Sequence, residues 1–490
     1  MSISTPVAPG RRRRRLILAI CCMSLFIVGL DNTIVNVALP SIRTDLHASV
    51  SELQWTVDAY TLVLASLLML SGSTADRLGR VRVFQVGLVL FTLGSLACSA
   101  APSVGWLILF RMVQAVGGSM LNPVAMSIIR NTFEDPRERA QAIGIWGGVV
   151  GISLALGPVI GGALVEISWR AIFLVNIPVG LAAIALTARF VPESRAPHAR
   201  RIDPVGQLLI ITMLASLTYA IIEGPNFGWT SARIAGLFAV AVLALVGLLL
   251  YEPRRTEPLI ELRFFRSAPF SGATVIAVAA FAALGGFLFL NTLYLQEVRG
   301  LSALHAGLYT LPMAVMTIVF GPLSGRIVGT RGARTPLALG GAGLMISGLM
   351  LTGLTATTPV GWLLASYVVF GIGFGFVNPP ITNAAVSGMP SGQAGVAAAV
   401  ASTSRQVGQS LGVAIIGATT TAGLAGSLHA GLASASHTGW WIIAGCGALV
   451  LAIGLGSTTR WADGTAVRTA ARMAPPPPRA AVDAPAAAGA

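Results

Sequence analysis

The sequence predicts an all-α integral membrane protein with fourteen transmembrane helices. Of its 490 residues, 54% are hydrophobic and only 10% are charged, whereas about 25% of the residues in a soluble domain are charged. Its apolar segments run for about 20 residues, the length that an α-helix needs to cross about 30 Å of hydrocarbon. Because barrel strands need only about 10 alternating residues, these segments favour a helical bundle over a β-barrel or a soluble fold.

The fourteen expected helices form three groups along the chain. We interpret the first apolar segment as a retained helix and not as a signal peptide, because no small-residue cleavage site follows it and Asp31 interrupts it. The helices are expected to begin near Leu16, Leu53, Val83, Trp106, Ala140 and Arg170 in the first half, near Pro204 and Ala232 in an inserted pair, and near Phe270, Ala303, Pro336, Val360, Gly392 and Gly439 in the second half.

An internal repeat supports this grouping. Asn122-Pro123 recurs as Asn378-Pro379, and the segment GSTADRLGRVRV from Gly72 has a degraded partner, GPLSGRIVGTRGAR, from Gly321. Repeated halves with a site between them are common in secondary transporters. We therefore predict six-helix bundles over residues 1–203 and 263–460, a two-helix insertion with its cytoplasmic linker over 204–262, and a disordered cytoplasmic tail over 461–490, which is rich in Pro and Ala.

The distribution of arginine predicts the orientation. All 32 basic residues are Arg, and the chain has no Lys, which excludes a lysine-containing phosphate loop and a lysine Schiff base. With an even number of spans and a cytoplasmic N-terminus, 26 of the 32 Arg fall on the cytoplasmic side, as the positive-inside rule requires. We expect a monomeric protein of the cytoplasmic membrane with both termini inside. The net charge of +14 then indicates contact with membrane lipid and not nucleic acid.

Four charged residues are expected within the membrane, where ionisable groups are functional candidates by default. Asp31 and Arg111 should lie at similar depth on two helices, at 1.5 Å of rise per residue. Asp58 lies close to that level on a polar stripe, and Arg405 lies on another helix. Asp31 is the first candidate for a proton carrier, with a permanent ion pair and substrate contact as the alternatives. Arg111 would control its charge, since Arg keeps its own.

The other polar residues are weighed against simpler roles. For Asp58, hydration or a place at the helix start competes with proton carriage, and for Arg405 a packing ion pair competes with substrate contact. The five His fall in loops or at helix ends, so none is assigned to a buried relay. Cys21, Cys22, Cys98 and Cys446 lie in apolar segments and are expected to pack. We predict no metal site, no cofactor and no enzymatic activity.

Several motifs resemble those of a known transporter family. The segment from Gly72 to Arg80, with Asp76, Arg77 and Gly79, resembles the G-x-x-x-D-R-x-G-R loop of the major facilitator superfamily, although Thr74 stands where Leu is frequent. The first helix contains LDNTIVNVALP from Leu30, which resembles the L-D-x-T-I-V-N-V-A-L-P motif of the fourteen-helix drug:proton antiporter branch. GPVIGG from Gly157 and WRAIFLVNIPVG from Trp169 are also similar to motifs of that branch.

The resemblance implies proton-driven export of lipophilic drugs or antibiotics. It implies a gating loop at Gly72, Asp76, Arg77, Gly79 and Arg80, and an antiporter hinge at Gly157, Pro158, Gly161 and Gly162, for which close packing is the alternative. Asn32, Asn36, Arg405 and Gln409 are candidates for substrate or ion-pair contact. Helices nine to twelve have no acidic residue well inside them, so we expect lipophilic substrates that are neutral or weakly cationic. A dedicated metabolite exporter, a proton-coupled importer and a non-transporting membrane sensor stay open as alternatives.

Overall fold

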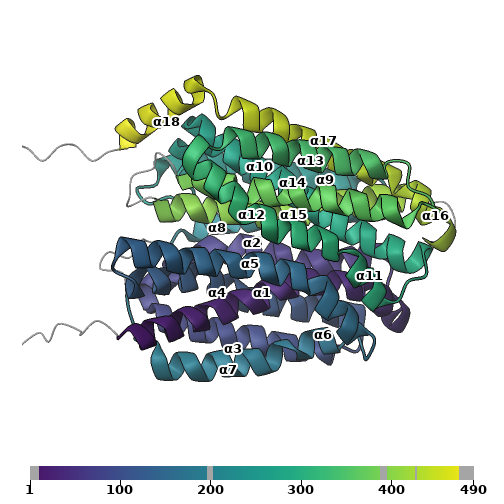
Figure 1. Ribbon diagram of the computed structural model, residues 1–490, viewed down its shortest axis with the longest axis horizontal. Helices are drawn as coiled ribbons and strands as arrows, with labels where there is room; N and C mark the ends of the chain where they lie inside the picture. The colour runs from purple at the N-terminus through teal and green to yellow at the C-terminus, as the bar shows by residue number, and fades with distance from the viewer. Residues whose placement is uncertain (1–9, 196–201, 387–393, 425–427, 474–490) are drawn as a thin grey trace, which may run out of the picture.

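The first half of the chain is a bundle of long helices. The computed structural model describes residues 10–195, 202–386, 394–424 and 428–473 (Figure 1). Ser49 and Glu52 form a capping box at the start of the second helix, which satisfies amides that the helix itself cannot pair. The helices are α1 (Arg11–Leu46), α2 (Val50–Leu78), α3 (Arg80–Ser99), α4 (Val104–Thr132), α5 (Pro136–Val165), α6 (Ala171–Leu174) and α7 (Asn176–Phe190).

The inserted pair consists of α8 (Pro204–Phe227) and α9 (Ala232–Tyr251). Asp203 caps α8, and Pro204 occupies the first helical position, where its missing N–H costs nothing. Gln207 of α8 donates to the Ser66 carbonyl of α2 at 2.6 Å. Helix α8 also packs against α15, so the insertion lies against both halves. Two short 3-10 turns, η1 (Glu252–Arg254) and η2 (Leu262–Arg266), lead into the second half.

The second half repeats the packing of the first. Its elements are α10 (Ala268–Leu293), a π-helical turn η3 (Tyr294–Val298), α11 (Ala303–Tyr309), α12 (Leu311–Arg331), α13 (Arg334–Leu351), α14 (Val360–Val386), α15 (Ala394–Gly423), α16 (Leu428–Ala435), α17 (His437–Gly456) and α18 (Arg460–Met473). Helix α1 packs on α5 as α10 packs on α15, and α2 and α3 pack on α4 as α12 and α13 pack on α14. Pro123 lies inside α4 and Pro379 inside α14, so the repeated Asn-Pro pair occupies equivalent helices.

Each expected span has a helical counterpart in the described residues, although the expected start near Gly392 lies outside them. Twelve helices are long and apolar enough to cross a membrane, and α5 makes thirteen if its two segments, which are bent by 41°, form one span. Helix α15 has 30 residues but is not among these candidates. Ser402, Arg405, Gln406 and Gln409 give it a polar middle. The structure therefore shows a multi-pass helical membrane protein with twelve to thirteen candidate spans.

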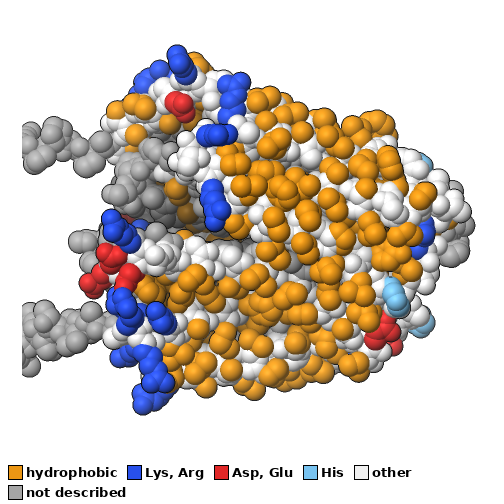
Figure 2. Space-filling model, in the orientation of Figure 1, with side chains coloured by type: hydrophobic (Ala, Val, Ile, Leu, Met, Phe, Trp, Pro, Cys, Tyr) orange, Lys and Arg blue, Asp and Glu red, His pale blue; other side chains and the backbone are white. Residues whose placement is uncertain are grey.

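The surface separates an apolar belt from charged ends. Hydrophobic side chains cover the middle of the molecule, whereas most Arg side chains on this face gather at one end (Figure 2). Helix α9 contributes strongly to the belt, since Leu243 is 69% exposed. Such exposure suits a surface that contacts lipid tails. Helix α1 begins and α18 ends at the end rich in Arg (Figure 1), which we call the terminus end; the other is the opposite end.

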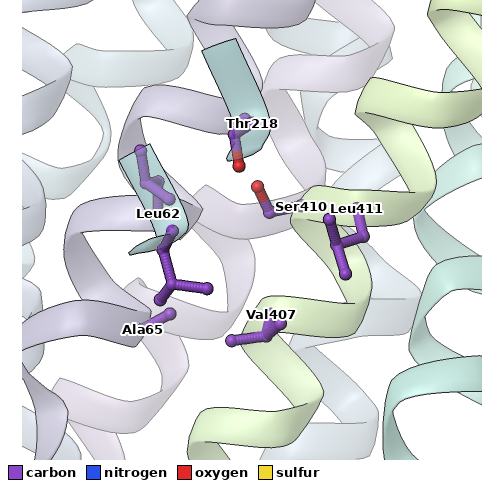
Figure 3. Close-up of a pocket in the computed structure, with 7 residues that line it drawn as sticks. Leu62, Ala65, Thr218, Val407, Ser410 and Leu411 are labelled. Carbon is purple, nitrogen blue, oxygen red and sulfur yellow. The ribbon is translucent and has the colours of Figure 1, made fainter. Parts of the chain in front are cut away.

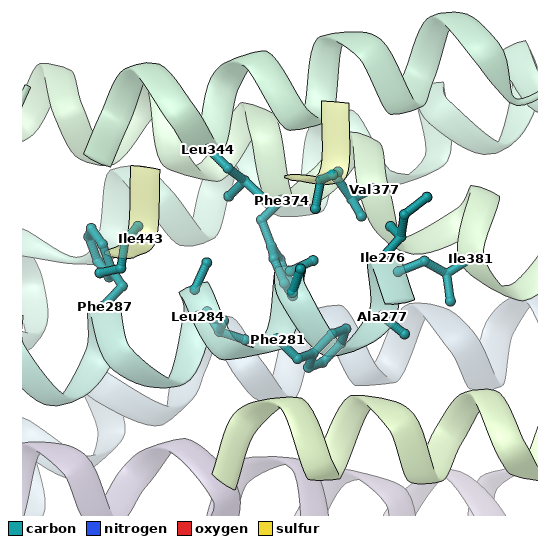
Figure 4. Packing of buried hydrophobic residues seen from close by; sticks show 14 of the residues in the cluster. Ile276, Ala277, Phe281, Leu284, Phe287, Leu344, Phe374, Val377, Ile381 and Ile443 are labelled. Carbon is teal, nitrogen blue, oxygen red and sulfur yellow. The ribbon is translucent and has the colours of Figure 1, made fainter. Parts of the chain in front are cut away.

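The core of the second half is aromatic. The rings of Phe287 and Phe370 stack with centroids 4.2 Å apart, and the ring of Phe281 meets the edge of Phe374 at 5.2 Å. These side chains come from α10 and α14 and interdigitate with aliphatic residues such as Leu284 (Figure 4). Aromatic pairs of this geometry add to the free energy of apolar burial.

The prediction of a disordered tail from residue 461 is wrong for its first part. Residues up to Met473 form α18, whereas residues 474–490, including the run of prolines, lie outside the described residues. Ala462, Thr465 and Thr469 are buried, and Thr465 Oγ1 accepts a hydrogen bond of 2.8 Å from the Ala268 amide at the start of α10. The composition did not reveal that a helical face could pack on the bundle.

Candidate functional site

A buried ion pair joins α1 and α4. Arg111 donates from Nη1 to the Asp31 carboxylate. The side chains of Asp31 and Arg111 are 0% and 1% exposed, so both charges are removed from solvent. The similar depth that the sequence predicted for them is thus realised as direct contact.

Two amide side chains complete the surroundings of the Asp31 carboxylate. Gln114 Nε2 donates to Asp31 Oδ1 at 2.8 Å, and Asn176 Nδ2 donates to the same oxygen at 3.0 Å. Both amides also donate to Ser95 Oγ, at 3.2 and 3.0 Å. Because a buried carboxylate needs a donor for each oxygen, this network holds Asp31 in one position. We call Asp31, Arg111, Gln114, Asn176 and Ser95 the Asp31 network.

The guanidinium of Arg111 is equally well surrounded. Its Nε donates to the Thr56 carbonyl at 3.3 Å, and its Nη1 donates to Gln114 Oε1 at 2.8 Å. The ring of Tyr60 lies 4.1 Å from the guanidinium carbon, a distance suited to a cation–π contact. The partners of the ion pair come from α2, α3, α4 and α7, so the whole site belongs to the first half.

Sequence reasoning found the two charges but missed their partners. Gln114 lies three residues after Arg111 on the same helical face, and this spacing could have identified it. Asn176 stands in the segment WRAIFLVNIPVG but was not assigned a role. Ser95 and Tyr60 carried no signal of their own, because isolated hydroxyl groups are frequent in membrane helices.

Asp58 is fully buried, so the hydrated or helix-start position considered from the sequence is wrong. Its side chain is 0% exposed, eight residues into α2. No group in the described chain makes a hydrogen bond of ordinary geometry to either carboxylate oxygen, although the hydroxyls of Thr61 and Ser410 are close enough to interact. Asp58 therefore lies between α2 and α15 without a cationic partner among the described residues.

A narrow crevice lies beside this region, between α2, α8 and α15. It is lined by Leu62, Ala65, Leu214, Thr218, Val407, Ser410 and Leu411 and has no room for a water molecule. The hydroxyl groups of Thr218 and Ser410 point toward each other across it (Figure 3). Two halves and the insertion thus meet around a dry, mostly apolar contact.

Arg405 does not form the ion pair that the sequence allowed. No acidic side chain lies within ion-pair distance of it in the described residues. It donates to the hydroxyl of Thr382 on α14, and its guanidinium carbon lies 5.9 Å from the Phe281 ring. Its Nε has no hydrogen-bond partner among the described residues.

Amide side chains connect the two halves. Asn32 Nδ2 on α1 donates to Gln409 Oε1 on α15 at 2.9 Å. Gln54 on α2 donates to the carbonyls of Val413 and Ala414 at 3.2 and 3.1 Å. Asn36 makes only long contacts to carbonyls of its own helix, at 3.4 and 3.5 Å, and its Oδ1 is unpartnered. Asn32 and Gln409 therefore form a direct bridge, while the Oδ1 atoms of Asn32 and Asn36 have no partner among the described residues.

The loop between α2 and α3 forms a tight turn. Gly79 has a φ of +114°, a region that favours glycine. Asp76 accepts two hydrogen bonds from Arg80, at 2.9 and 3.0 Å, so this pair closes within the loop and not across the halves. Arg77 is exposed, and Gly72 lies inside α2.

The partner of this loop is Glu193, which sequence reasoning missed. Its carboxylate accepts from the amides of Val81 and Arg82 at 3.0 and 3.1 Å. A carboxylate at a helix start is favourable because the free amides and the helix dipole both attract it. A Cβ on Gly79 would lie 2.8 Å from Glu193, so only glycine leaves room for this cap.

The GPVIGG segment of α5 combines close packing with a bend. A Cβ on Gly157 would lie 1.9 Å from Thr33 Oγ1, one on Gly161 would lie 2.7 Å from Ile34, and one on Gly162 would lie 2.6 Å from the Ala303 carbonyl. The 41° bend separates Arg137–Leu154 from Leu156–Val165. Pro158 has no N–H to donate to the Leu154 carbonyl, and its ring crowds that carbonyl, which accounts for a bend at this level.

At the opposite end, polar contacts tie the two halves together. Arg43 of α1 pairs with Glu297 of η3 at 2.8 Å, and Gln296 donates to the Val37 carbonyl at 2.9 Å. Glu166, just after α5, accepts from the Leu304 amide at 3.3 Å. Hydrogen bonds from Ser302 and Leu304 lower the pKa of the Glu166 carboxyl. We call these the opposite-end contacts, which were not predicted from the sequence.

The described residues contain no group of three or more His, Cys, Asp or Glu side chains that could hold a metal ion. The Asp31 network itself consists of one buried acid, its guanidinium partner and the side chains that surround them.

Comparison with known proteins places this chain among transporters. It is 38% identical over 419 residues to the tetracenomycin C resistance and export protein of Streptomyces glaucescens, covering 84% of this chain and 77% of that protein. It is 35% identical to the multidrug resistance protein Stp of Mycobacterium tuberculosis, with coverage of 85% and 78%. It is 34% identical to the multidrug efflux pump LfrA of Mycolicibacterium smegmatis, with coverage of 83% and 80%.

Solved structures share the fold. A bacterial homologue of the human lysosomal transporter Spinster, in an inward-facing and unoccupied conformation, superposes with a TM-score of 0.65 at 19% identity, covering 96% of this chain and all of that one. A D-xylose-proton symporter has a TM-score of 0.65 at 14% identity, with coverage of 91% and 97%. The profile of the Major Facilitator Superfamily matches residues 21–413. This chain belongs to the Major Facilitator Superfamily, whose members are membrane transporters and not enzymes.

Proposed function

We propose that this protein exports lipophilic drugs or antibiotics across the cytoplasmic membrane in exchange for protons. The observation that carries the proposal is the Asp31 network, which places one acid beside one guanidinium in a buried site of the first half. The names of the relatives at 34 to 38% identity, which are drug and antibiotic exporters or resistance proteins, support export over import.

The coupling follows from the partners of Asp31. A proton on the Asp31 carboxylate would remove the counter-charge of Arg111, so proton uptake and separation of the pair favour each other. In the reverse direction, return of the guanidinium displaces the proton. Each proton that enters down a membrane potential of 100 mV supplies about 2.3 kcal/mol, which can drive uphill export. Asp58 is the second candidate for proton coupling, since it is buried without a cationic partner in the described chain.

Alternating access requires one end to be closed while the other is open. The opposite-end contacts join the two halves at one end of the molecule. The exchange of states would break the opposite-end contacts, with the bend of α5 at Pro158 as the hinge.

We further propose fourteen spans, with both termini in the cytoplasm. Helix α5 supplies the thirteenth span as a bent helix, and α15 supplies the fourteenth, since it packs against α2, α8 and α10. The even number agrees with the common end of α1 and α18 (Figure 1), and the gathering of Arg at that end favours the cytoplasm. A cytoplasm-specific reporter fused after Arg460 should be active, and activity of a periplasmic reporter there would contradict the topology.

The decisive experiment compares Asp31→Asn with unmodified protein. Asn keeps the shape of the side chain but binds no proton, so accumulation of a fluorescent lipophilic drug in inside-out proteoliposomes should stop when only a proton-motive force drives it. Asp463→Asn, which changes an exposed acid on α18, is the matched control and should transport normally. If Asp31→Asn vesicles still accumulate drug against a gradient, Asp31 is structural, and Asp58→Asn is the next variant to test.

A susceptibility panel in an efflux-deficient host separates broad from dedicated export. Protection against several unrelated lipophilic compounds supports a multidrug exporter, and protection against one compound supports a dedicated exporter. Protection against none, with the protein correctly inserted, would contradict drug export altogether.

A further inference from the structure

Helix α18 has a second face that the transport mechanism does not use. Its first face is fixed to the bundle, because Thr465 Oγ1 accepts a hydrogen bond from the first amide of α10 at 2.8 Å and Thr469 is buried beside it. That amide is one of the donors that a helix cannot satisfy by itself. Helix α18 is therefore held in a defined orientation relative to the second half.

The free face of α18 carries an aromatic ring and two guanidinium groups. Trp461 is 69% exposed, and Arg468 and Arg472 are exposed on the same flank, 7 and 11 residues further on. Gly464 lies between them, and the only atom near its missing Cβ is Arg468 Nη1, at 3.6 Å. The Arg468 side chain thus lies back along the helix toward Trp461.

The turn η2 extends this face with residues distant in the sequence. It packs against α18 and exposes Phe265 and Arg266. No acidic side chain forms an ion pair with Arg266, Arg468 or Arg472 in the part of the chain that the structure describes. We call Phe265, Arg266, Trp461, Arg468 and Arg472 the α18 patch.

The position of the α18 patch points to its partner. Helix α18 begins four residues after Gly456, the last residue of the span formed by α17, and η2 ends two residues before the span of α10. Helix α18 lies at the terminus end of the bundle (Figure 1), so the ends of these two spans put the α18 patch at the boundary between hydrocarbon and water. Trp favours that level, and guanidinium groups there attract anionic headgroups and bind phosphate with two hydrogen bonds.

We infer that the α18 patch is a binding surface for anionic phospholipid headgroups of the membrane leaflet at the terminus end. The headgroup phosphate binds between Arg468 and Arg472, while Trp461 and Phe265 insert at the level of the glycerol backbone. Because α18 is bonded to the start of α10, the bound lipid also fixes the end of a central helix of the second half.

The test uses the full chain in nanodiscs of phosphatidylcholine that contain a minor fraction of lipid with brominated tails, either phosphatidylglycerol or phosphatidylcholine. Bromine quenches nearby Trp, and the difference between the protein and Trp461→Phe isolates the signal of Trp461. We expect brominated phosphatidylglycerol to quench Trp461 much more strongly than brominated phosphatidylcholine. The double variant Arg468→Gln/Arg472→Gln should lose about 25-fold in this preference, at about fivefold for each arginine near the surface.

Matched variants decide whether the site is specific. Arg326→Gln/Arg331→Gln removes two exposed arginines from α12 at the same end and should keep the preference, whereas high salt should weaken it in the unmodified protein. Equal quenching by the two brominated lipids, or equal loss in both double variants, would overturn the inference. The quenching measurement does not require transport. Its outcome is therefore independent of the proposed export function.

Discussion

The two halves repeat one helical arrangement but enclose different kinds of side chain. The first half encloses the Asp31 network, in which a carboxylate and a guanidinium share amides, a hydroxyl and a carbonyl as partners. The second half encloses aromatic rings that contact Phe287 by stacking and by their edges. It also encloses a guanidinium, Arg405, without an acidic partner among the described residues. The same packing therefore encloses a buried ion pair in the first half and mainly aromatic contacts in the second.

We infer from this difference that the two halves have different roles in transport. In a membrane, packing and hydrogen bonding replace the hydrophobic effect between helices, so an apolar bundle can move as a body without exposing unpaired charge. The charged bundle cannot, because separating Asp31 from Arg111 leaves a buried charge without compensation. We therefore propose that the step sensitive to protons takes place in the first half.

The largest expected effect comes from removing one partner of the buried pair. Arg111→Ala should destabilise the protein by about 3–5 kcal/mol, because Asp31 stays buried without its counter-charge, and proton-driven transport should be lost. Arg405→Ala, which breaks no ion pair in the described chain, should cost clearly less. Thermal unfolding in detergent measures both. If Arg111→Ala and Arg405→Ala lowered the free energy of unfolding equally, the proposed difference between the two halves would be contradicted.

Next in size is the aromatic core of the second half. Phe287 is fully buried, so Phe287→Ala should cost about 3–5 kcal/mol by lost contacts and a cavity, while the pH dependence of transport in the surviving protein stays unchanged. Leu243→Ala, at a side chain exposed to lipid, should change the unfolding temperature little. A shift of the pH profile in Phe287→Ala would mean that the second half takes part in proton coupling.

Glycines at two equivalent contacts, α1 with α5 and α10 with α15, allow the packing of the two halves to be compared. A Cβ on Gly412 would lie 2.2 Å from the backbone carbonyl of Ala282, whereas one on Gly157 would meet the movable side chain of Thr33. Gly412→Ala should therefore destabilise more than Gly157→Ala, within about 1–3 kcal/mol. Gly151→Ala, with open space around it, is the control and should be neutral in thermal unfolding. The reverse order of the two variants would show that α5 is the more tightly packed helix.

The smallest effect concerns an opposite-end contact. The pKa of Glu166 is lowered below its ordinary value of 4.5 by hydrogen bonds that need the charged carboxylate. The contact to α11 is thus fully present above pH 4.5 and is lost as the pH falls through the lowered pKa. Spin labels on α5 and α11 should separate only in that acidic range. In Glu166→Gln the separation should no longer depend on pH, and a persistent acid transition would assign it to another group.

The sequence was sufficient for the features that depend on composition and spacing. Apolar length predicted the helical membrane fold, the Asn-Pro repeat predicted equivalent helices, and the depths of Asp31 and Arg111 predicted that they could meet, because a helix converts residue number into height. The positive φ of Gly79 also agrees with the turn that its motif implied. The fourteen-span count stays a prediction, since α5 is bent and α15 has a polar middle.

What only the tertiary structure decided is which polar groups face each other. Helical height does not give rotation around the bundle, so Gln114, Asn176 and Ser95 could not be assigned to Asp31, nor Glu193 to the loop at Gly79. For the same reason, the sequence could not show that Asp58 is sealed between α2 and α15, that Arg405 lacks an acidic partner in the described chain, or that residues after Arg460 form a docked helix. Composition and spacing determine how far along the membrane normal a residue lies; the packing of neighbouring helices determines what it contacts there.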